Sequence, residues 1–436
     1  MSAVIRDQMT VLGPQTPSGV VRVSGAKNAG TRLMAAAMLT TEKVTLLNFP
    51  TELVDARHKA RFIADIGGEI VLDDNTDQAE IKCGNISAAS LTDFNYPIRT
   101  TYLLAAGQLH RSGVAFIPYP GGCNLGARKY DLHLMVWEAL GCEVLLKENH
   151  IEIRCAPGGL RGSEIVFPIT TVGGTENAVL CAAVAKGTTR IRNAYITPEI
   201  TNLIELMELM GARIHVHGVS EIVVEGVDSL RGATCRVMAD RIEALTWIIY
   251  AALSGGDILI EDVPFESLEI PLIHLQAAGI DIFRNKSAAY VSPKCFLHGS
   301  IQPFEVACGT HPGVISDMQP FYTLLAMKGA GRSLIVDYRY PERVGYLNEL
   351  QKFAPGSLSW EAGLSAVIRV DGTRTFQAAN ANSTDLRGSM AVVLAALLAE
   401  GESRIDNVGM ALRGYNNLAK KLAGLGVVAN FSSREG

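Results

Sequence analysis

Apolar and polar positions along the chain form helical patterns that recur about every 70 residues. Five segments read as an amphipathic helix that ends at a glycine before a strand: FIADIGGEI, VWEALGCEV, LMELMGARI, HLQAAGIDI and KLAGLGVVA. The interval between Gly279 and Gly426 is about twice as long as the others, and a sixth segment, LQKFAPGSL, lies within it. Glycine is the usual residue of a left-handed helix end, so we predict six helix stops. Their glycines are Gly67, Gly141, Gly211, Gly279, Gly356 and Gly426.

Each repeat also contains an earlier and more uniformly apolar helix. Two of the six are GTRLMAAAMLTTEKVTLLNFP and IEALTWIIYAALSGGDILIEDVP, and both continue past small residues into a β-rich segment. The repeated unit is therefore mixed α/β, with two helices in each copy. A chain of 436 residues is too long for one ordinary core, so we expect two domains of three units each.

Composition narrows the function mainly by exclusion. The net charge of −5 and pI near 6.0 give no general attraction to nucleic acid or to an anionic membrane. No apolar run reaches the roughly 18–20 residues that span a bilayer, and MSAVIRDQMTVLG lacks the apolar core of a signal peptide. We therefore expect a cytoplasmic protein, in which an anionic substrate would need a local basic pocket.

Sequence motifs exclude several common sites. No GxGxxG follows a predicted strand and no GxxxxGK[ST] occurs, which argues against a nucleotide-binding doubly wound sheet. The eight cysteines include no CxxC pair, which argues against a zinc site and a disulfide framework. Most of them read as small buried hydrophobic residues. Cys123 differs, because YPGGCNLGARKYDLH surrounds it with glycines and a basic residue.

Charged residues gather where the predicted helices begin. Helix capping can explain carboxylates at these places. We interpret Asp55, Asp131, Asp240 and Asp385 either as caps of this kind or as functional residues. Capping does not explain the basic residues, because the helix dipole disfavours positive charge at an N-terminus. Helix starts with Lys and Arg form a site for phosphate and carboxylate groups. The basic residues at these places are Lys27, Arg99, Arg128, Arg343, Arg387 and Arg413.

Taken together, the motifs resemble the enolpyruvyl transferase family from about residue 8 to residue 430. In chain order they are SGAKNA, PGGCNLGAR with DLH, TVGGTEN, DRIEA, SDMQ, TDLR and RGY. The resemblance implies a two-domain inside-out α/β barrel of six repeats, with a substrate cleft between the domains. Residues 26–238 would form the first domain and carry the Cys123 loop. Residues 1–25 and 239–436 would form the second, with both termini.

The resemblance also implies an activity. Within the family the motifs are most similar to those of enzymes that transfer the enolpyruvyl group of phosphoenolpyruvate to the 3-hydroxyl of UDP-N-acetylglucosamine. That reaction is the first committed step of peptidoglycan precursor synthesis. The substrates would be phosphoenolpyruvate and a uridine nucleotide sugar, with no metal or other cofactor and no obligatory protein partner.

Residue roles follow from matching positions. Lys27, Arg128 and Arg413 match the residues that hold phosphoenolpyruvate. Cys123 matches a loop cysteine associated with proton delivery and product release, which is also the thiol that fosfomycin alkylates. Asp317 matches the residue at the acceptor hydroxyl, and Lys27, Cys123 and Asp317 form the expected catalytic set. Acceptor-side positions are Asn28, Arg99, Asp131, Thr171, Val172, Gly173, Asp317, Arg343, Asp385 and Arg387.

The chemistry requires these residue types. Phosphoenolpyruvate carries a carboxylate and a phosphate, which cations must bracket. Attack at its C2 needs a proton donor for C3 and a base for the attacking hydroxyl. Cations near the departing phosphate stabilise its developing charge. A thiol beside Arg128 should have a lowered pKa, which suits Cys123 to proton transfer.

Some motifs depart from the family pattern and leave alternatives open. Lys129-Tyr130 replaces Pro-Val, Gly30-Thr31-Arg32 replaces Ala-Leu-Pro, and VISDMQ and ALRGY replace FPTDMQ and IDRGY. The phosphoenolpyruvate positions are kept, whereas several changes fall where the nucleotide would lie. One alternative is therefore the same transfer to another nucleotide or sugar acceptor. A shikimate-3-phosphate enzyme or a nucleotide-binding paralogue without activity fits the motifs less well.

Overall fold

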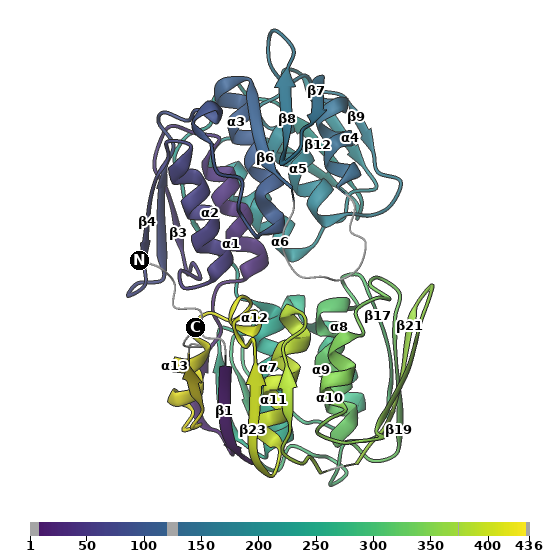
Figure 1. The fold of residues 1–436 in the computed structure, drawn as a ribbon. Helices are drawn as coiled ribbons and strands as arrows, with labels where there is room; N and C mark the ends of the chain where they lie inside the picture. The colour runs from purple at the N-terminus through teal and green to yellow at the C-terminus, as the bar shows by residue number, and fades with distance from the viewer. Residues whose placement is uncertain (1–7, 120–129, 374, 433–436) are drawn as a thin grey trace. The chain divides into compact units, whose positions relative to one another are not determined.

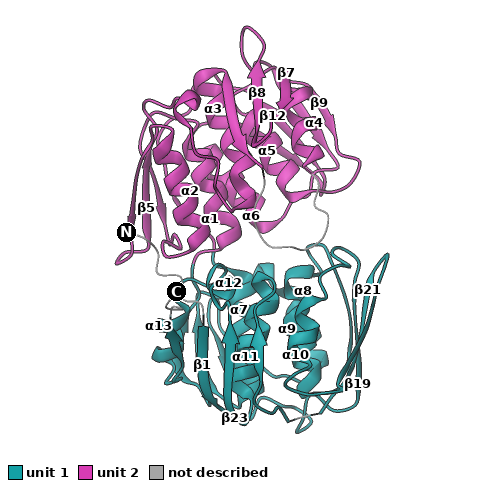
Figure 2. Cartoon of the chain, in the orientation of Figure 1, with its two compact units in different colours: residues 1–24, 123–127, 239–436 teal, residues 25–122, 128–238 magenta. Residues whose placement is uncertain are grey.

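The computed structural model describes residues 8–119, 130–373 and 375–432 of the chain. The chain divides into two compact units (Figure 2). Unit 2 contains the described residues of Gly25–Gly122 and Arg128–Met238. Unit 1 contains those of Met1–Ser24 and Ala239–Gly436, so it carries the start and the end of the described chain.

Unit 2 is built from three sheets and the helices that they surround. The sheet orders are β13-β3-β5-β4, β6-β8-β7 and β11-β12-β10-β9. The helices are α1 (Lys27–Ala37), α2 (Val54–Asp65), α3 (Ala105–Ser112), α4 (Asp131–Ala139), α5 (Val172–Ala182) and α6 (Pro198–Leu209), with short 3₁₀ helices η1 (Ala88–Ser90) and η2 (Arg99–Leu104). The strands are β3 (Val44–Leu47), β4 (Glu69–Asp73), β5 (Gln78–Lys82), β6 (Val114–Pro118), β7 (Cys142–Leu146), β8 (His150–Cys155), β9 (Glu164–Val166), β10 (Thr188–Arg192), β11 (Arg213–His217), β12 (Glu221–Glu225) and β13 (Thr234–Arg236).

Unit 1 has the same plan. Its sheet orders are β15-β16-β14-β2, β18-β17-β19-β21-β20 and β22-β23-β1-β24. The helices are α7 (Arg241–Ser254), α8 (Glu269–Ala277), α9 (Gln319–Lys328), α10 (Gly345–Leu350), α11 (Leu386–Leu398), α12 (Gly409–Leu412) and α13 (Leu418–Gly424), with η3 (Phe265–Ser267) and η4 (Ser316–Met318). The strands are β1 (Gln8–Gly13), β2 (Ser18–Arg22), β14 (Asp257–Glu261), β15 (Phe283–Arg284), β16 (Ala289–Val291), β17 (Glu305–Gly309), β18 (Val314–Ile315), β19 (Arg332–Asp337), β20 (Leu358–Ala362), β21 (Ala366–Asp371), β22 (Asn380–Asn382), β23 (Gly401–Asp406) and β24 (Asn430–Ser432).

The six described sheets share one topology. The strand that follows the apolar helix of each repeat pairs antiparallel with the next strand of its sheet, as β3 pairs with β5 and β19 with β21. In five of the six sheets the same strand also has a parallel neighbour, such as β13 for β3 or β17 for β19. In the sheet β6-β8-β7, no such parallel strand is found among the described residues. The predicted repeat is therefore confirmed.

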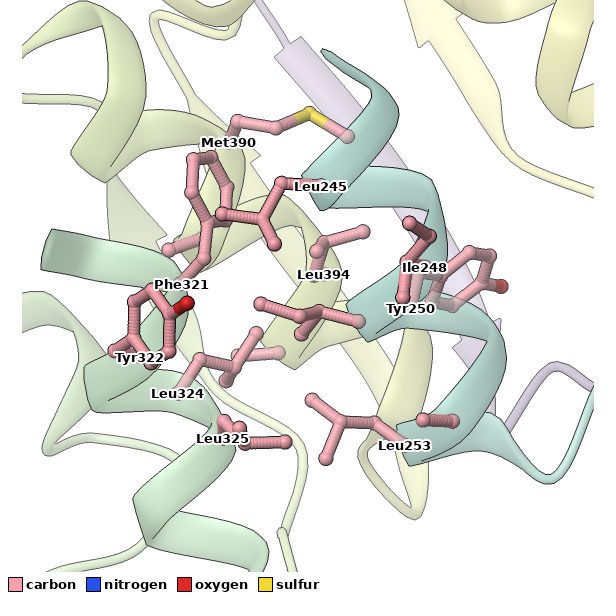
Figure 3. Close-up of a cluster of buried hydrophobic side chains, with 14 of the residues drawn as sticks. Leu245, Ile248, Tyr250, Leu253, Phe321, Tyr322, Leu324, Leu325, Met390 and Leu394 are labelled. Carbon is pink, nitrogen blue, oxygen red and sulfur yellow. The ribbon is translucent and has the colours of Figure 1, made fainter. Parts of the chain in front are cut away.

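The apolar helices form the centre of each unit and the sheets form its outside. In unit 1, α9 contacts β19 and β21, while α11 contacts β1 and β23 (Figure 1). Every residue of α11 is buried, whereas β10 buries alternate residues and exposes the others. A helix that is apolar on all sides needs such a central position. Leu245 of α7, Phe321 of α9 and Leu394 of α11 pack together in this core (Figure 3). The expected inside-out α/β barrel fold is confirmed.

All six predicted stop glycines have a left-handed backbone. Their φ angles lie between +75° at Gly426 and +101° at Gly211. A Cβ atom at Gly211 or Gly426 would meet no other atom within 4 Å, so the backbone conformation and not crowding favours glycine there. Gly356, the displaced member after Pro355, has φ of +81° and follows the same rule.

Among the described residues, no helix is both long and apolar enough to cross a membrane.

Candidate active site

Lys27 is the first residue of α1 and forms an ion pair inside unit 2. Its Nζ lies 2.9 Å from Oδ2 of Asp55, which is in the first turn of α2, and both side chains are largely buried. The N-cap residue of α2 is Leu53 and Asp55 lies inside the first turn, so the interpretation of Asp55 as the N-cap is wrong. The carboxylate instead offsets the lysine charge.

Two further basic residues lie close to this pair. Arg32 Nε is 2.9 Å from Oε1 of Glu176, a fully buried residue of α5. Lys59 of α2 is also fully buried, and its Nζ donates a 2.6 Å hydrogen bond to the Thr31 carbonyl oxygen. Burial and the nearby Arg32 hold the pKa of Lys59 well below its usual value, and burial raises the pKa of Glu176 against the effect of Arg32. We call Lys27, Arg32, Asp55, Lys59 and Glu176 the unit 2 cluster.

Sequence reasoning missed the role of Lys59 and Arg32. Arg32 was noted only as a departure from the family pattern, although it lies one helical turn beyond Asn28. Its Nη1 is 3.5 Å from Asn28 Oδ1, so it can orient this predicted acceptor residue. Lys59 stands in an amphipathic segment where a lysine normally faces solvent, but it is buried where α2 packs against α1.

The other predicted acceptor residues of unit 2 lie at helix starts. Arg99 begins η2 and Asp131 begins α4, where Asp131 is exposed and makes no cap hydrogen bond in the structure. Thr171 caps α5 by accepting a 3.2 Å hydrogen bond from the Gly174 backbone nitrogen. Val172 and Gly173 follow as the first residues of α5. Because α5 contacts both η2 and α4, these predicted residues gather in one region of the unit.

A buried histidine lies under this region. The His133 ring centroid is 4.5 Å from that of Tyr102, and burial with Arg99 nearby lowers the pKa of His133 to about 3. Its Nδ1 has no hydrogen-bond partner among the residues that the structure describes. A Cβ at position 173 would lie 3.1 Å from His133 Nε2, which favours glycine there. His133 is therefore a neutral packing residue that shapes the start of α5.

In unit 1, Arg343 joins two predicted carboxylates. Its Nη1 is 2.8 Å from Oδ1 of Asp317, and its Nε is 3.8 Å from Oδ1 of Asp385. Burial opposes the charge of Arg343, but Asp317 and Asp385 outweigh it and raise its pKa. The guanidinium is therefore a permanent cation in the interior of this unit.

Arg387 is a second buried cation beside Asp317. Its Nε is 3.8 Å from Oδ2 of Asp317 and its Nη2 is 3.5 Å from Oδ2 of Asp240. The guanidinium lies over the Tyr415 ring at 5.2 Å and donates a 3.3 Å hydrogen bond to the Gly414 carbonyl. Residues from four separate segments thus meet at the Arg387 guanidinium. We call Asp240, Asp317, Arg343, Asp385 and Arg387 the unit 1 cluster.

The three aspartates of the unit 1 cluster differ in role. Asp240 caps α7 by accepting from the backbone nitrogens of Ile242 and Glu243, at 2.8 and 3.1 Å. Asp385 caps α11 in the same way, so the capping prediction is confirmed for both. Asp317 lies inside η4, and neither η4 nor α9 has a side-chain cap. Its side chain is also 24% exposed, compared with 6% for Asp385 and 4% for Asp240.

The remaining predicted site residues are Arg413, Cys123 and Arg128. Arg413 follows α12 as its C-terminal cap residue, so the prediction that it opens a helix is wrong. A cation is favoured at that end by the helix dipole, although α12 has only four residues. Cys123 and Arg128 lie outside the described residues, as does Lys129.

Comparison with known proteins decides the family. The sequence profile described as EPSP synthase (3-phosphoshikimate 1-carboxyvinyltransferase) matches residues 11–422. The chain belongs to this enolpyruvyl transferase family. It is similar to proteins named UDP-N-acetylglucosamine 1-carboxyvinyltransferase from Sphingopyxis alaskensis and Methylocella silvestris. Identity is 34% and 36%, over 96% and 97% of this chain and 98% of each relative.

Solved structures show the same fold. The enolpyruvyl transferase NikO from Streptomyces tendae has a TM-score of 0.84 at 22% identity, covering 98% of this chain and 99% of that one. EPSP synthase from Acinetobacter baumannii has a TM-score of 0.72 at 15% identity, covering 98% and 100%. At these identities the likeness supports the barrel architecture and not an acceptor.

Both clusters suit the chemistry of an enolpyruvyl transferase. Cations on a helix start can hold an anionic substrate, as Lys27 on α1 can. A partly exposed carboxylate fixed by two guanidinium groups can accept a proton from a hydroxyl, as Asp317 can. No group of three or more His, Cys, Asp or Glu side chains in the described parts of the chain is arranged to hold a metal ion.

Proposed function

We propose that the protein transfers the enolpyruvyl group of phosphoenolpyruvate to the 3-hydroxyl of UDP-N-acetylglucosamine and releases phosphate. The observation that carries the proposal is 34–36% identity over nearly the whole chain to proteins named for this transfer. The two clusters support it, because each contains a group that the reaction needs. The proposed setting is the first committed step of peptidoglycan precursor synthesis in the cytoplasm.

The proposed reaction is an addition followed by an elimination. Asp317 takes the proton of the acceptor hydroxyl as its oxygen bonds to C2 of phosphoenolpyruvate, and Cys123 delivers a proton to C3. The tetrahedral intermediate then loses a proton from C3 and phosphate from C2, which restores the double bond on the acceptor. Lys27, Arg128 and Arg413 hold the phosphate and carboxylate and stabilise the charge on the leaving phosphate.

Exposure favours Asp317 as the base. Asp240 and Asp385 are nearly inaccessible and are occupied by backbone nitrogens of their helices. Asp317 is the accessible carboxylate of the unit 1 cluster, so an external hydroxyl can approach it. Because Lys27 belongs to unit 2 and Asp317 to unit 1, the proposed reaction requires residues of both units.

Acceptor-side roles are proposed for the remaining residues. Asn28, Arg99, Asp131 and the Thr171–Gly173 segment would contact the nucleotide from unit 2, as their positions at helix starts allow. Arg343, Asp385 and Arg387 would act on the unit 1 side. The ion pairs of Arg343 with Asp317 and of Arg387 with Asp317 and Asp240 support a second role for the two arginines, which is to position the base.

A phosphate-release assay tests the proposal. The protein is mixed with phosphoenolpyruvate and, separately, with UDP-N-acetylglucosamine, UDP-glucose, UDP and UMP. We expect release with UDP-N-acetylglucosamine and a product that retains the nucleotide and gains the enolpyruvyl group by mass spectrometry. Release with another acceptor alone would support the same transfer to a different substrate, and no release with any would contradict the proposed chemistry.

Cys123 provides a second test of the proposed site. Fosfomycin carries an epoxide and a phosphonate, so the cations that would hold phosphoenolpyruvate should direct it to this thiol. We expect alkylation of Cys123 that is faster with the acceptor nucleotide present, read by peptide mapping. Cys123→Asp should resist the drug and keep part of the turnover, because a carboxylic acid can still donate a proton. Label on a different cysteine would contradict the assignment.

A further inference from the structure

Two cysteines face each other across the β7–β8 hairpin of unit 2. Cys142 is the first residue of β7 and Cys155 is the last residue of β8, and the strand register pairs them directly. Their sulfur atoms are 3.7 Å apart. No sequence motif indicated this pair, because the two residues are separated by a full hairpin.

Their position in the ladder allows the two thiols to be joined. The Lys147 nitrogen donates to the His150 carbonyl, and hydrogen-bonded pairs alternate along an antiparallel ladder. Counting from that pair, Cys142 and Cys155 form a non-hydrogen-bonded pair. The Cys155 nitrogen accordingly donates to the Gly113 carbonyl on the β6 side of the sheet. In such pairs the Cα atoms are about 4.5 Å apart, within the range that disulfides span.

The two sulfurs differ in accessibility and in protonation. Cys142 is 8% exposed, whereas Cys155 is partly exposed at the open end of the hairpin. Either thiol can donate to the other across this contact, which lowers the pKa of Cys155 and raises that of Cys142. Cys155 is therefore the sulfur that meets an oxidant first, and Cys142 is the neighbour that can displace the adduct.

We propose that Cys142 and Cys155 form a reversible disulfide site that reacts with small-molecule disulfides such as oxidised glutathione. The Cys155 thiolate attacks one sulfur of the reagent and releases one thiolate. The Cys142 thiol then loses its proton and displaces the second reagent thiolate from Cys155. The two protein thiols are oxidised, the reagent disulfide is reduced to two thiols, and the step is reversed by added dithiol. This site does not depend on the proposed transferase activity.

Peptide mapping of the full-length protein tests the proposal. The reduced protein is incubated with oxidised glutathione, its remaining thiols are alkylated, and it is digested with trypsin. Cleavage after Lys147 and Arg154 places Cys142 and Cys155 on separate peptides, so only a disulfide can keep them together. We expect the linked pair to form and to separate again with dithiothreitol. Recovery of both as separate alkylated peptides would overturn the proposal.

Three variants distinguish the roles of the sulfurs. Cys142→Ser should leave a stable glutathione adduct on Cys155, because the displacing thiol is gone. Cys155→Ser should leave Cys142 without an adduct, because Cys142 is the less accessible sulfur. Cys181→Ala, at a fully buried thiol of neighbouring α5, should leave formation of the linked pair unchanged. A link between Cys142 and Cys181, or an adduct on Cys142 in the Cys155→Ser protein, would contradict the assignment.

Discussion

The charged clusters of the two units differ in how their charges are paired. In the unit 2 cluster, Lys27 pairs with Asp55 and Arg32 with Glu176, and the buried carboxylate of Glu199 lies near Glu176. Among the described residues, no carboxylate lies within ion-pair distance of Lys59. Burial without a paired carboxylate disfavours the charged form of Lys59, and its pKa is lowered accordingly.

In the unit 1 cluster, carboxylates outnumber the cations. Asp240, Asp317 and Asp385 surround Arg343 and Arg387, so three carboxylates meet two guanidinium groups. Two of these carboxylates are also held by helix N-termini, which leaves Asp317 as the accessible one. The excess negative charge is thus concentrated on the residue nearest to solvent.

The difference matches the proposed roles of the two clusters. An anionic substrate stabilises buried cations, which suits the unit 2 cluster to bind phosphoenolpyruvate. An accessible carboxylate in a set of fixed charges suits the unit 1 cluster to take a proton.

Removing a buried arginine of unit 1 should cause the largest loss of stability. Arg343→Met leaves Asp317 and Asp385 without their shared cation, and breaking a buried ion pair costs about 3–5 kcal/mol. Arg332 provides a matched control, because its Nε is also 2.8 Å from an aspartate, Asp371, but both are exposed. Arg332→Met should cost less than about 1 kcal/mol. Equal losses for the two variants in denaturant unfolding would show that the unit 1 cluster is not a buried network.

Lys27→Met should weaken phosphoenolpyruvate binding by on the order of 2–5 kcal/mol, because it removes a cation from a largely buried anion site. Calorimetry with the acceptor nucleotide present measures this change, and acceptor binding itself should be nearly unchanged. Lys43→Met is the control, since Lys43 pairs with Glu80 at 3.0 Å on the surface of the same unit. Normal phosphoenolpyruvate affinity in the Lys27→Met protein would contradict the proposal that the unit 2 cluster binds phosphoenolpyruvate.

Lys59 should make the unit 2 cluster sensitive to pH. Burial and Arg32 lower its pKa in the folded protein, so between that value and the ordinary lysine pKa the unfolded chain binds the extra proton. The stability of the wild type relative to Lys59→Met should therefore rise with pH, by up to about 1.4 kcal/mol per pH unit. Unfolding curves of both proteins from neutral to alkaline pH measure the slope. A stability difference that stays constant across this range would mean that Lys59 is not perturbed by its surroundings.

Much of the fold could be predicted from local sequence. The stop glycines and the strands after the apolar helices depend on short patterns, and all six glycine positions have the expected left-handed backbone. Residues with positive φ at the ends of β3, β10, β14 and β23 were not predicted. They are Asn48, Asn193, Asp262 and Asn407, and three asparagines at one repeat position were the signal that could have revealed them.

The site was less predictable where it depends on contacts between repeats. Helix-start position identified Lys27 and Arg387, but not that Asp55 pairs with Lys27 across two helices. Lys59 could not be recognised because its burial follows from the packing of α2 against α1 rather than from its own segment. The facing thiols of Cys142 and Cys155 depend on hairpin register, which the spacing of two cysteines does not reveal.

The turnover of Asp317→Asn tests most directly whether Asp317 is the base that takes the proton of the acceptor hydroxyl. Asparagine keeps the size and hydrogen-bonding capacity of aspartate but cannot take the proton of the acceptor hydroxyl. We expect phosphate release slower by at least about a hundredfold, with nucleotide binding and melting temperature close to those of the wild type. Asp371→Asn, at an exposed ion pair of the same unit, should leave all three unchanged. Turnover of Asp317→Asn within a few-fold of the wild type would contradict the assignment of Asp317 as the base.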